Sequence, residues 1–104
     1  MNSVVLIGRL TSDPEIREYG KGKNAGMVAS YTLAVNRSGQ DEADFIRCST
    51  FNAGAEFVEK YLKKGMKIAV NGEIRTGSYE NKKGDTVYTT EVIVKQHEFC
   101  EPKK

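Results

Sequence analysis

The alternation of apolar and polar side chains predicts an all-β chain with one short helix. The expected strands are residues 3–10, 27–35, 44–51, 66–76 and 87–96, and the expected helix is residues 52–65. The helix is indicated by Phe57, Val58, Tyr61 and Leu62, which share one face at helical spacing. Glycines and prolines without a sustained period predict a loop over residues 11–24, and residues 77–85 read as a hairpin connection.

The third expected strand has two unlike faces, because successive side chains of a strand point to opposite sides. One face carries Ile46, Cys48 and Thr50, and the other carries Phe45, Arg47, Ser49 and Phe51. Burying both rings would bury Arg47 between them, which is costly for an unpaired guanidinium. This pattern favours exposed rings interleaved with positive charge, a surface suited to stacking unpaired bases. In the alternative, the rings are core and Arg47 escapes at a sheet edge with its stem buried.

The other strands predict where the core lies. Residues 3–10 are apolar on both faces, so this strand is expected to be central or covered by a second subunit. Tyr31 is expected in the core, and Ile68, Val70 and Ile74 are expected to face inward, with a bend at Gly72. Asn52 is a plausible helix cap, and Gly65 fits the position that follows a helix.

Length and composition indicate a single soluble domain of 104 residues, with residues 1–100 folded and a polar tail at 101–104. No apolar stretch is long enough to span a bilayer, and no secretory signal is recognisable. Cys48 and Cys100 form no metal-binding motif, so a reduced, cytoplasmic setting is expected, with no cofactor. The net charge is only +2, so any nucleic-acid site must be a local concentration of cations.

Five strands with the helix between the third and fourth are the element order of the five-stranded OB-fold barrel. That fold binds nucleic acid across strands 2 and 3 and through the loops after strands 1 and 4. The aromatic strand is the third, which favours exposed rings. The expected patch combines this strand with the fourth strand and the loop that follows it. Its members are Phe45, Arg47, Phe51, Arg75 and Tyr79, with Lys82 and Lys83 in the same loop as Tyr79.

The chain also resembles the bacterial single-stranded DNA-binding (SSB) proteins over nearly its whole length. The similar segments are residues 4–11, 13–15, 32–37, 43–48, 61–65, 72–76 and 88–92. The resemblance implies a cytoplasmic homotetramer, with a dimer also possible, that binds single-stranded DNA in replication, recombination and repair. It also implies stacking by Phe45, Phe51 and Tyr79, and backbone contacts by Arg47, Lys64 and Arg75.

Two departures from the family pattern are visible. Some members have tryptophans at two of the three stacking positions and another in the loop after strand 2, where this chain has Gly39 and no tryptophan anywhere. Weaker stacking and a different site size follow as expectations. Members also commonly carry a long tail with an acidic tip, whereas this sequence ends in two lysines, which puts tail-mediated recruitment of replication proteins in doubt.

Three other functions stay open. A nuclease is the first, but His97 has no partner pattern and reads as a surface histidine, while Asp13, Glu15 and Glu18 show no metal-ligand motif. We therefore expect no enzymatic activity. A protein-interaction OB module and an RNA-binding module of the cold-shock type are the second and third alternatives.

Overall fold

The computed structural model describes residues 1–39 and 41–100, apart from the side chain of Asn24. Its elements are β1 (Val4–Leu10), β2 (Glu15–Tyr19), the 3₁₀ helix η1 (Gly22–Asn24), β3 (Gly26–Asn36), β4 (Ala43–Phe51), α1 (Ala53–Tyr61), β5 (Lys67–Glu80) and β6 (Thr86–Phe99). The expected tail at residues 101–104 lies outside the described residues.

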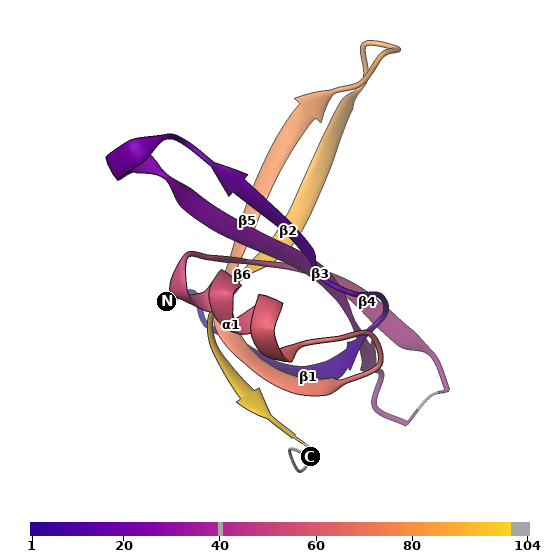
Figure 1. Ribbon diagram of the computed structural model, residues 1–104. Helices are drawn as coiled ribbons and strands as arrows, with labels where there is room; N and C mark the ends of the chain where they lie inside the picture. The colour runs from indigo at the N-terminus through magenta and orange to yellow at the C-terminus, as the bar shows by residue number, and fades with distance from the viewer. Residues whose placement is uncertain (40, 101–104) are drawn as a thin grey trace.

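Five of the strands close into a ring in the order β1, β5, β6, β4, β3. The ring closes where β3 returns to β1, through the pairs Arg9↔Ala34 and Leu10↔Leu33. Neighbours are antiparallel except for β4 and β6, which run parallel. Two hairpins, β2–β3 and β5–β6, extend beyond the ring on the same side (Figure 1). This arrangement confirms the predicted five-stranded OB-fold barrel with one helix.

The core lies inside the ring and beneath α1, which packs against β3, β4 and β6. Its fully enclosed side chains include Leu33, Cys48, Val58, Ile68 and Val70. Tyr31 is buried, as predicted, with 4% of its surface exposed. Thr50 is also enclosed, and its hydroxyl donates to the carbonyl of Val94 at 3.1 Å, which satisfies the one polar group it brings inside.

The predicted loop over residues 11–24 is wrong in its middle, because residues 15–19 form β2 and pair with β3. β2 lies at the edge of the sheet, and Ile16 alone in it is partly buried. A strand with one half-buried side chain has almost no apolar alternation, so the sequence gives no periodic signal for it.

The predicted hairpin connection over residues 77–85 is strand in its first part, residues 77–80. β5 continues to Glu80 and pairs with β6 through Gly77↔Thr89 and Tyr79↔Val87, and the turn itself occupies residues 81–85. We call residues 73–80 with 86–93 the ribbon, because there β5 no longer pairs with β1. Ile74, at the base of the ribbon, keeps the predicted inward side, because it pairs with the buried Val92, but it is 46% exposed and is not enclosed in the core.

The helix is shorter than predicted and begins differently. Asn52 has a positive φ of 52° and makes no capping hydrogen bond; its Oδ1 instead accepts from the backbone N–H of Met27 at 3.2 Å. α1 stops at Tyr61, so Gly65, with φ of 87°, belongs to the following turn. Across the described ranges, no helix is long and apolar enough to cross a membrane.

β1 keeps the two apolar faces that its sequence predicts. Leu10 points into the core, whereas Val5 and Ile7 are 67% and 51% exposed on the outer face of the sheet. β1 lies between β5 and the short pairing with β3, so it is a central strand with one uncovered apolar side.

Candidate nucleic-acid interface

The outward sides of β4, β6 and β5 form one continuous surface, which we call the saddle face. On β4 it carries Phe45, Arg47, Ser49 and Phe51; on β6 it carries Glu91; on β5 it carries Arg75 and Tyr79. The strand register places Arg75 directly opposite Glu91, and Ser49 Oγ donates to Glu91 Oε2 at 2.9 Å. The register of the sheet therefore carries this face from the barrel onto the ribbon, across Glu91 and the buried Ser49.

The aromatic side chains of the saddle face are exposed. Phe45, Phe51 and Tyr79 keep 69%, 42% and 57% of their surfaces accessible. On the opposite side of β4, Cys48 and Thr50 are almost completely enclosed. The predicted orientation of this strand is confirmed, and the alternative with both rings in the core is excluded. The stacking role of the three rings remains a prediction.

Cations surround these rings. Arg47 stands between Phe45 and Phe51 on β4 and has no ion-pair partner among the described side chains. Arg75 Nη2 lies 3.5 Å from Glu73 Oε1, and Lys95 Nζ lies 3.5 Å from the other oxygen of that carboxylate. These pairs are loose and solvated, so a phosphate can compete for both cations.

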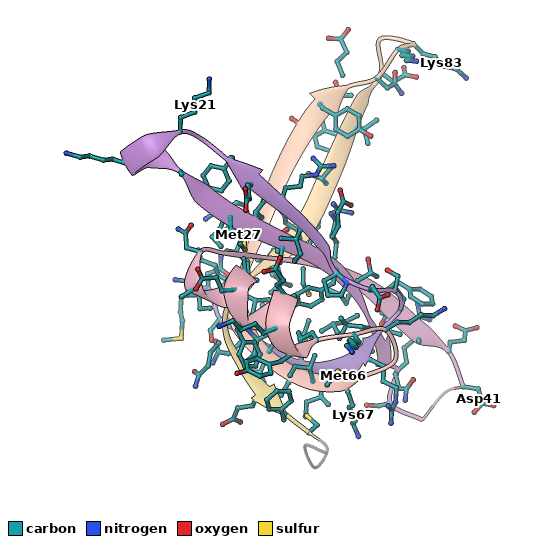
Figure 2. All side chains as sticks on the ribbon, in the orientation of Figure 1. Lys21, Met27, Asp41, Met66, Lys67 and Lys83 are labelled. Carbon is teal, nitrogen blue, oxygen red and sulfur yellow. The ribbon has the colours of Figure 1, made fainter. Side chains whose placement is uncertain are left out.

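The tips of both projecting hairpins are basic. Lys83 stands at the end of the ribbon and Lys21 at the end of the β2–β3 hairpin (Figure 2). Lys82 and Lys83 lie in the turn of the ribbon, which Asn81 stabilises. Asn81 Oδ1 accepts hydrogen bonds from the backbone N–H groups of Lys83 and Asp85 at 2.9 and 3.0 Å. Tyr79, Lys82 and Lys83 are thus brought together, as predicted, although Tyr79 lies on a strand.

Lys64 is separated from the other predicted contacts. It lies between α1 and β5, where its backbone N–H donates to Asp13 Oδ1 at 2.8 Å. The neighbouring residues Met66 and Lys67 lie at the opposite end of the molecule from Lys83 (Figure 2). A single strand that reached both ends would have to cross the whole barrel.

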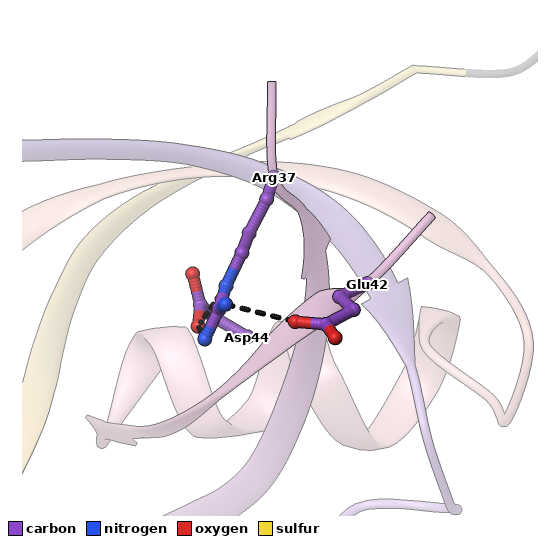
Figure 3. Close-up of polar contacts among 3 residues, drawn as sticks. All are labelled: Arg37, Glu42 and Asp44. Atoms are coloured by element: carbon purple, nitrogen blue, oxygen red, sulfur yellow. Dashed lines mark hydrogen bonds and ion pairs between the residues drawn. The ribbon is translucent and has the colours of Figure 1, made fainter. Parts of the chain in front are cut away.

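The turn between β3 and β4 is held by an ion-pair clasp (Figure 3). Arg37 Nη1 lies 2.9 Å from Glu42 Oε2, and Arg37 Nη2 lies 2.9 Å from Asp44 Oδ1. The hydrogen bond to Asp44 is the main reason that the pKa of Arg37 is raised. Asp44 immediately precedes Phe45. The positive charge of Arg37 therefore offsets the negative charges of two carboxylates beside the first ring of the saddle face.

His97 is not the surface histidine that the sequence predicts. Its Nε2 lies 2.7 Å from the hydroxyl of Tyr31, and its ring stacks on Phe57 at 5.2 Å between centroids. Burial lowers the pKa of His97 to about 4 and raises that of Tyr31. The sequence missed this because no partner of His97 is near it along the chain. Within the described residues no group of His, Cys, Asp and Glu could hold a metal ion.

Glu91 is a saddle-face residue that the sequence did not single out. It lies between Arg47 and Arg75 in the register of the sheet, and its carboxylate is held by Ser49. Burial, and then the charge of Glu91, raise the pKa of the Cys48 thiol to about 12. Cys48 is therefore an inert core side chain.

The closed five-stranded ring and its exposed aromatic and basic face define an OB-fold protein with a surface suited to single-stranded nucleic acid. A sequence model of the single-strand binding protein family matches residues 1–100, and the chain belongs to that family. Members of the family are named as DNA-binding proteins rather than enzymes.

Several relatives are similar over almost the whole chain. Single-stranded DNA-binding protein 1 of Staphylococcus aureus (strain Mu50 / ATCC 700699) is 50% identical over 108 aligned residues, which cover 99% of this chain and 67% of the relative. The single-stranded DNA-binding protein of Clostridium perfringens (strain 13 / Type A) is 51% identical, over 97% of this chain and 67% of the relative. Single-stranded DNA-binding protein A of Bacillus subtilis (strain 168) is 48% identical, over 99% and 61%.

Proposed function

We propose that this chain binds and protects single-stranded DNA with little sequence preference, in DNA replication, recombination and repair. The proposal assigns stacking to Phe45, Phe51 and Tyr79, and backbone contacts to Arg47, Lys64, Arg75, Lys82 and Lys83. The observation that carries it is that Phe45 and Phe51 are exposed, at 69% and 42%, on the same face of β4 as Arg47. The other face of this strand packs into the core.

The dimensions and energies of the saddle face suit a flexible single strand. Phe45 and Phe51 are six residues apart on β4, so their rings lie about 20 Å apart and serve different nucleotides. In OB-fold proteins of this class each stacked base contributes ~1–3 kcal/mol, and each neutralised phosphate adds ~0.7 to the slope of log K against log salt. Duplex DNA offers no free base face for stacking, so we expect the saddle face not to bind it.

The assembly we propose is a homotetramer. Val5 and Ile7, 67% and 51% exposed, leave an apolar strip on the outside of β1. Uncovered apolar surface of this kind is typical of subunit contacts. We also propose a cytoplasmic location and no catalytic activity. Incubation of labelled DNA with the protein and a divalent metal tests whether the protein cleaves DNA.

Titration with oligo-dT, followed by tyrosine fluorescence, tests the function. We expect Phe51→Ala to weaken binding ~5- to 150-fold with an unchanged salt slope, because it removes one stacked base. Arg47→Ala should instead lower the slope by ~0.7. Phe51→Leu is the matched control for stacking: it keeps an apolar side chain and loses the π face, so it should bind as weakly as Phe51→Ala.

Two results would contradict the proposal. The first is a Phe51→Ala variant that unfolds, with no selective loss of binding in the folded fraction. The second is a folded chain that fails to bind oligo-dT, which would favour a protein-interaction module. Competition between single-stranded DNA and RNA of equal length decides between this function and an RNA-binding one.

A further inference from the structure

The side chain of Asn2 forms two hydrogen bonds with the main chain of Ile74. Its Nδ2 donates to the carbonyl of Ile74 at 2.8 Å, and its Oδ1 accepts from the N–H of Ile74, also at 2.8 Å. Asn2 lies before the start of β1, and Ile74 is the point at which β5 leaves the barrel. The contact therefore joins the N-terminus to the base of the ribbon.

The side chain of Asn2 takes the place of the next backbone pair in the β1–β5 ladder. The last pair is Val4↔Gly72, and in an antiparallel register Asn2 is the residue opposite Ile74. Antiparallel partners of the hydrogen-bonded type exchange both N–H and C=O groups. The primary amide of Asn2 presents its carbonyl oxygen and one N–H side by side, as a residue in such a pair presents its own C=O and N–H, and it makes both bonds in place of its backbone.

This contact lies just beyond an irregular point of the β5–β6 pair, where the backbone pairing with β5 skips Lys95 of β6. The register between β5 and β6 shifts at Asn71 and Gly72, and Gly72 packs so tightly on the backbone of Ile93 that a Cβ would overlap it. Bulges bend a strand and change its twist. Among the described residues, the hydrogen bonds of Asn2 are the last that β5 receives from outside the β5–β6 pair before the ribbon extends into solvent.

We infer that Asn2 is a positioning residue for the ribbon, and that it sets where Tyr79 and Arg75 stand relative to Phe45 and Phe51. The inference rests on the proposed function and adds to it a residue that touches no DNA. By holding β5 immediately after the bulge, Asn2 prevents the ribbon from pivoting, so the single strand meets Tyr79 in register with the rings on β4. Without Asn2, each binding event must first order the ribbon, and that ordering weakens the contribution of Tyr79.

A double-mutant cycle between Asn2 and Tyr79 tests this inference, with affinity for oligo-dT as the readout. We expect Asn2→Ala to weaken binding ~3- to 10-fold, equivalent to two hydrogen bonds of modest net strength. In the Tyr79→Ala background the same change should have a clearly smaller effect, because the ring is gone and only Arg75 is left for Asn2 to position. Ser3→Ala, which removes the exposed polar side chain next to Asn2, is the control and should bind like the unaltered chain.

Asn2→Asp provides a second test in which only pH changes. The carboxylate repels the carbonyl of Ile74, but the protonated acid has the same donor and acceptor as the amide. Its affinity, relative to the unaltered chain, should therefore recover as the pH falls from about 6 to about 3.5, through the ordinary Asp pKa of ~3.9. Should Asn2→Ala fail to fold, this series still carries the test.

Additive losses in the cycle, or an Asn2→Asp variant whose relative affinity does not respond to pH, would overturn the role of Asn2 and leave the proposed function intact. A folded, unaltered chain that does not bind oligo-dT overturns the proposed function itself. The two failures are thus distinguished by the first titration.

Discussion

β4 and the ribbon both present rings to the saddle face, but they differ in what lies behind those rings. Behind Phe45 and Phe51, the other side of β4 is sealed into the core through Cys48 and Thr50, at 0% and 2% exposure. Behind Tyr79, the ribbon has no core: Tyr88, on its other face, is 80% exposed. One platform is fixed by the barrel, and the other stands free in solvent.

Because of this difference, the barrel determines the stability of the fold, whereas the ribbon affects binding more than stability. A strand of the closed ring opens only when the barrel unfolds, whereas a two-stranded ribbon is marginal by itself and opens at little cost. The orientation of Phe45 and Phe51 is therefore set before DNA arrives. The orientation of Tyr79 depends on a few local contacts, chiefly the turn at Asn81 and the Asn2 pair at the ribbon's base.

The largest expected contrast is in the free energy of unfolding. Leu33→Ala empties a fully buried site on β3 and should cost ~2–5 kcal/mol, because a cavity remains in the ring. Ile74→Ala, at the half-exposed base of the ribbon, should cost less than ~1 kcal/mol. Urea denaturation followed by circular dichroism measures both. Equal losses would mean that the ribbon folds as part of the core, and the comparison would fail.

A pH dependence should belong to the barrel alone. The pKa of His97 falls to about 4 in the folded chain because its ring is buried against Tyr31 and Phe57, while the unfolded value is ~6.5. The unfolded chain then binds a proton that the folded chain does not. The contribution of His97 to the free energy of unfolding is fully present above pH ~6.5. It falls by ~1–2 kcal/mol as the pH drops toward about 4, and the loss is no larger because the ring is partly exposed.

The difference between the unaltered chain and His97→Gln isolates this effect, because carboxylates titrate equally in both. Glutamine keeps a partner for the Tyr31 hydroxyl and has no pKa in the range. If the two stability profiles stay parallel from pH 7 to pH 4.5, the burial of His97 is not the cause.

The same contrast explains which elements could be predicted from the sequence. β3 has one buried face, so its apolar residues recur at every second position and predict its orientation. β4 carries apolar residues on both faces, so its orientation follows only when the OB-fold element order is added. The outer end of β5, residues 77–80, and all of β2 have no buried face. Their residues follow no period, and they read as loops although both are paired strands.

The site divides in a similar way. Phe45, Arg47 and Phe51 share one strand, so their common face is a local property that alternation predicts. The placement of Lys64 away from the ribbon, the burial of His97 by Tyr31, and the position of Glu91 beside Ser49 depend on which strands become neighbours. That information lies in the register of the sheet, which hydrophobic periodicity does not specify.

Asn81→Ala should loosen the ribbon and leave the barrel intact. The substitution removes two side-chain acceptors from the turn, at 2.9 and 3.0 Å, with a local cost of ~1 kcal/mol. Amide exchange should accelerate in residues 76–80 and 86–90 and stay unchanged in β3, and affinity for oligo-dT should fall a few-fold. Asn81→Asp keeps the acceptor and is the matched control. Faster exchange in β3 would show that the turn supports the whole fold.

The smallest expected effect concerns the clasp at the third hairpin, the turn between β3 and β4. Arg37→Ala exposes the charges of Glu42 and Asp44 beside Phe45, so affinity for oligo-dT should fall less than ~threefold at low salt and recover when salt screens the carboxylates. The urea midpoint should not change, because the ion pairs are exposed and the ring supports the turn from behind. The triple variant Arg37→Ala, Glu42→Gln and Asp44→Asn should regain the original affinity. A loss that persists in the triple variant would instead show that Arg37 contacts the DNA and that the saddle face extends past Phe45 into this turn.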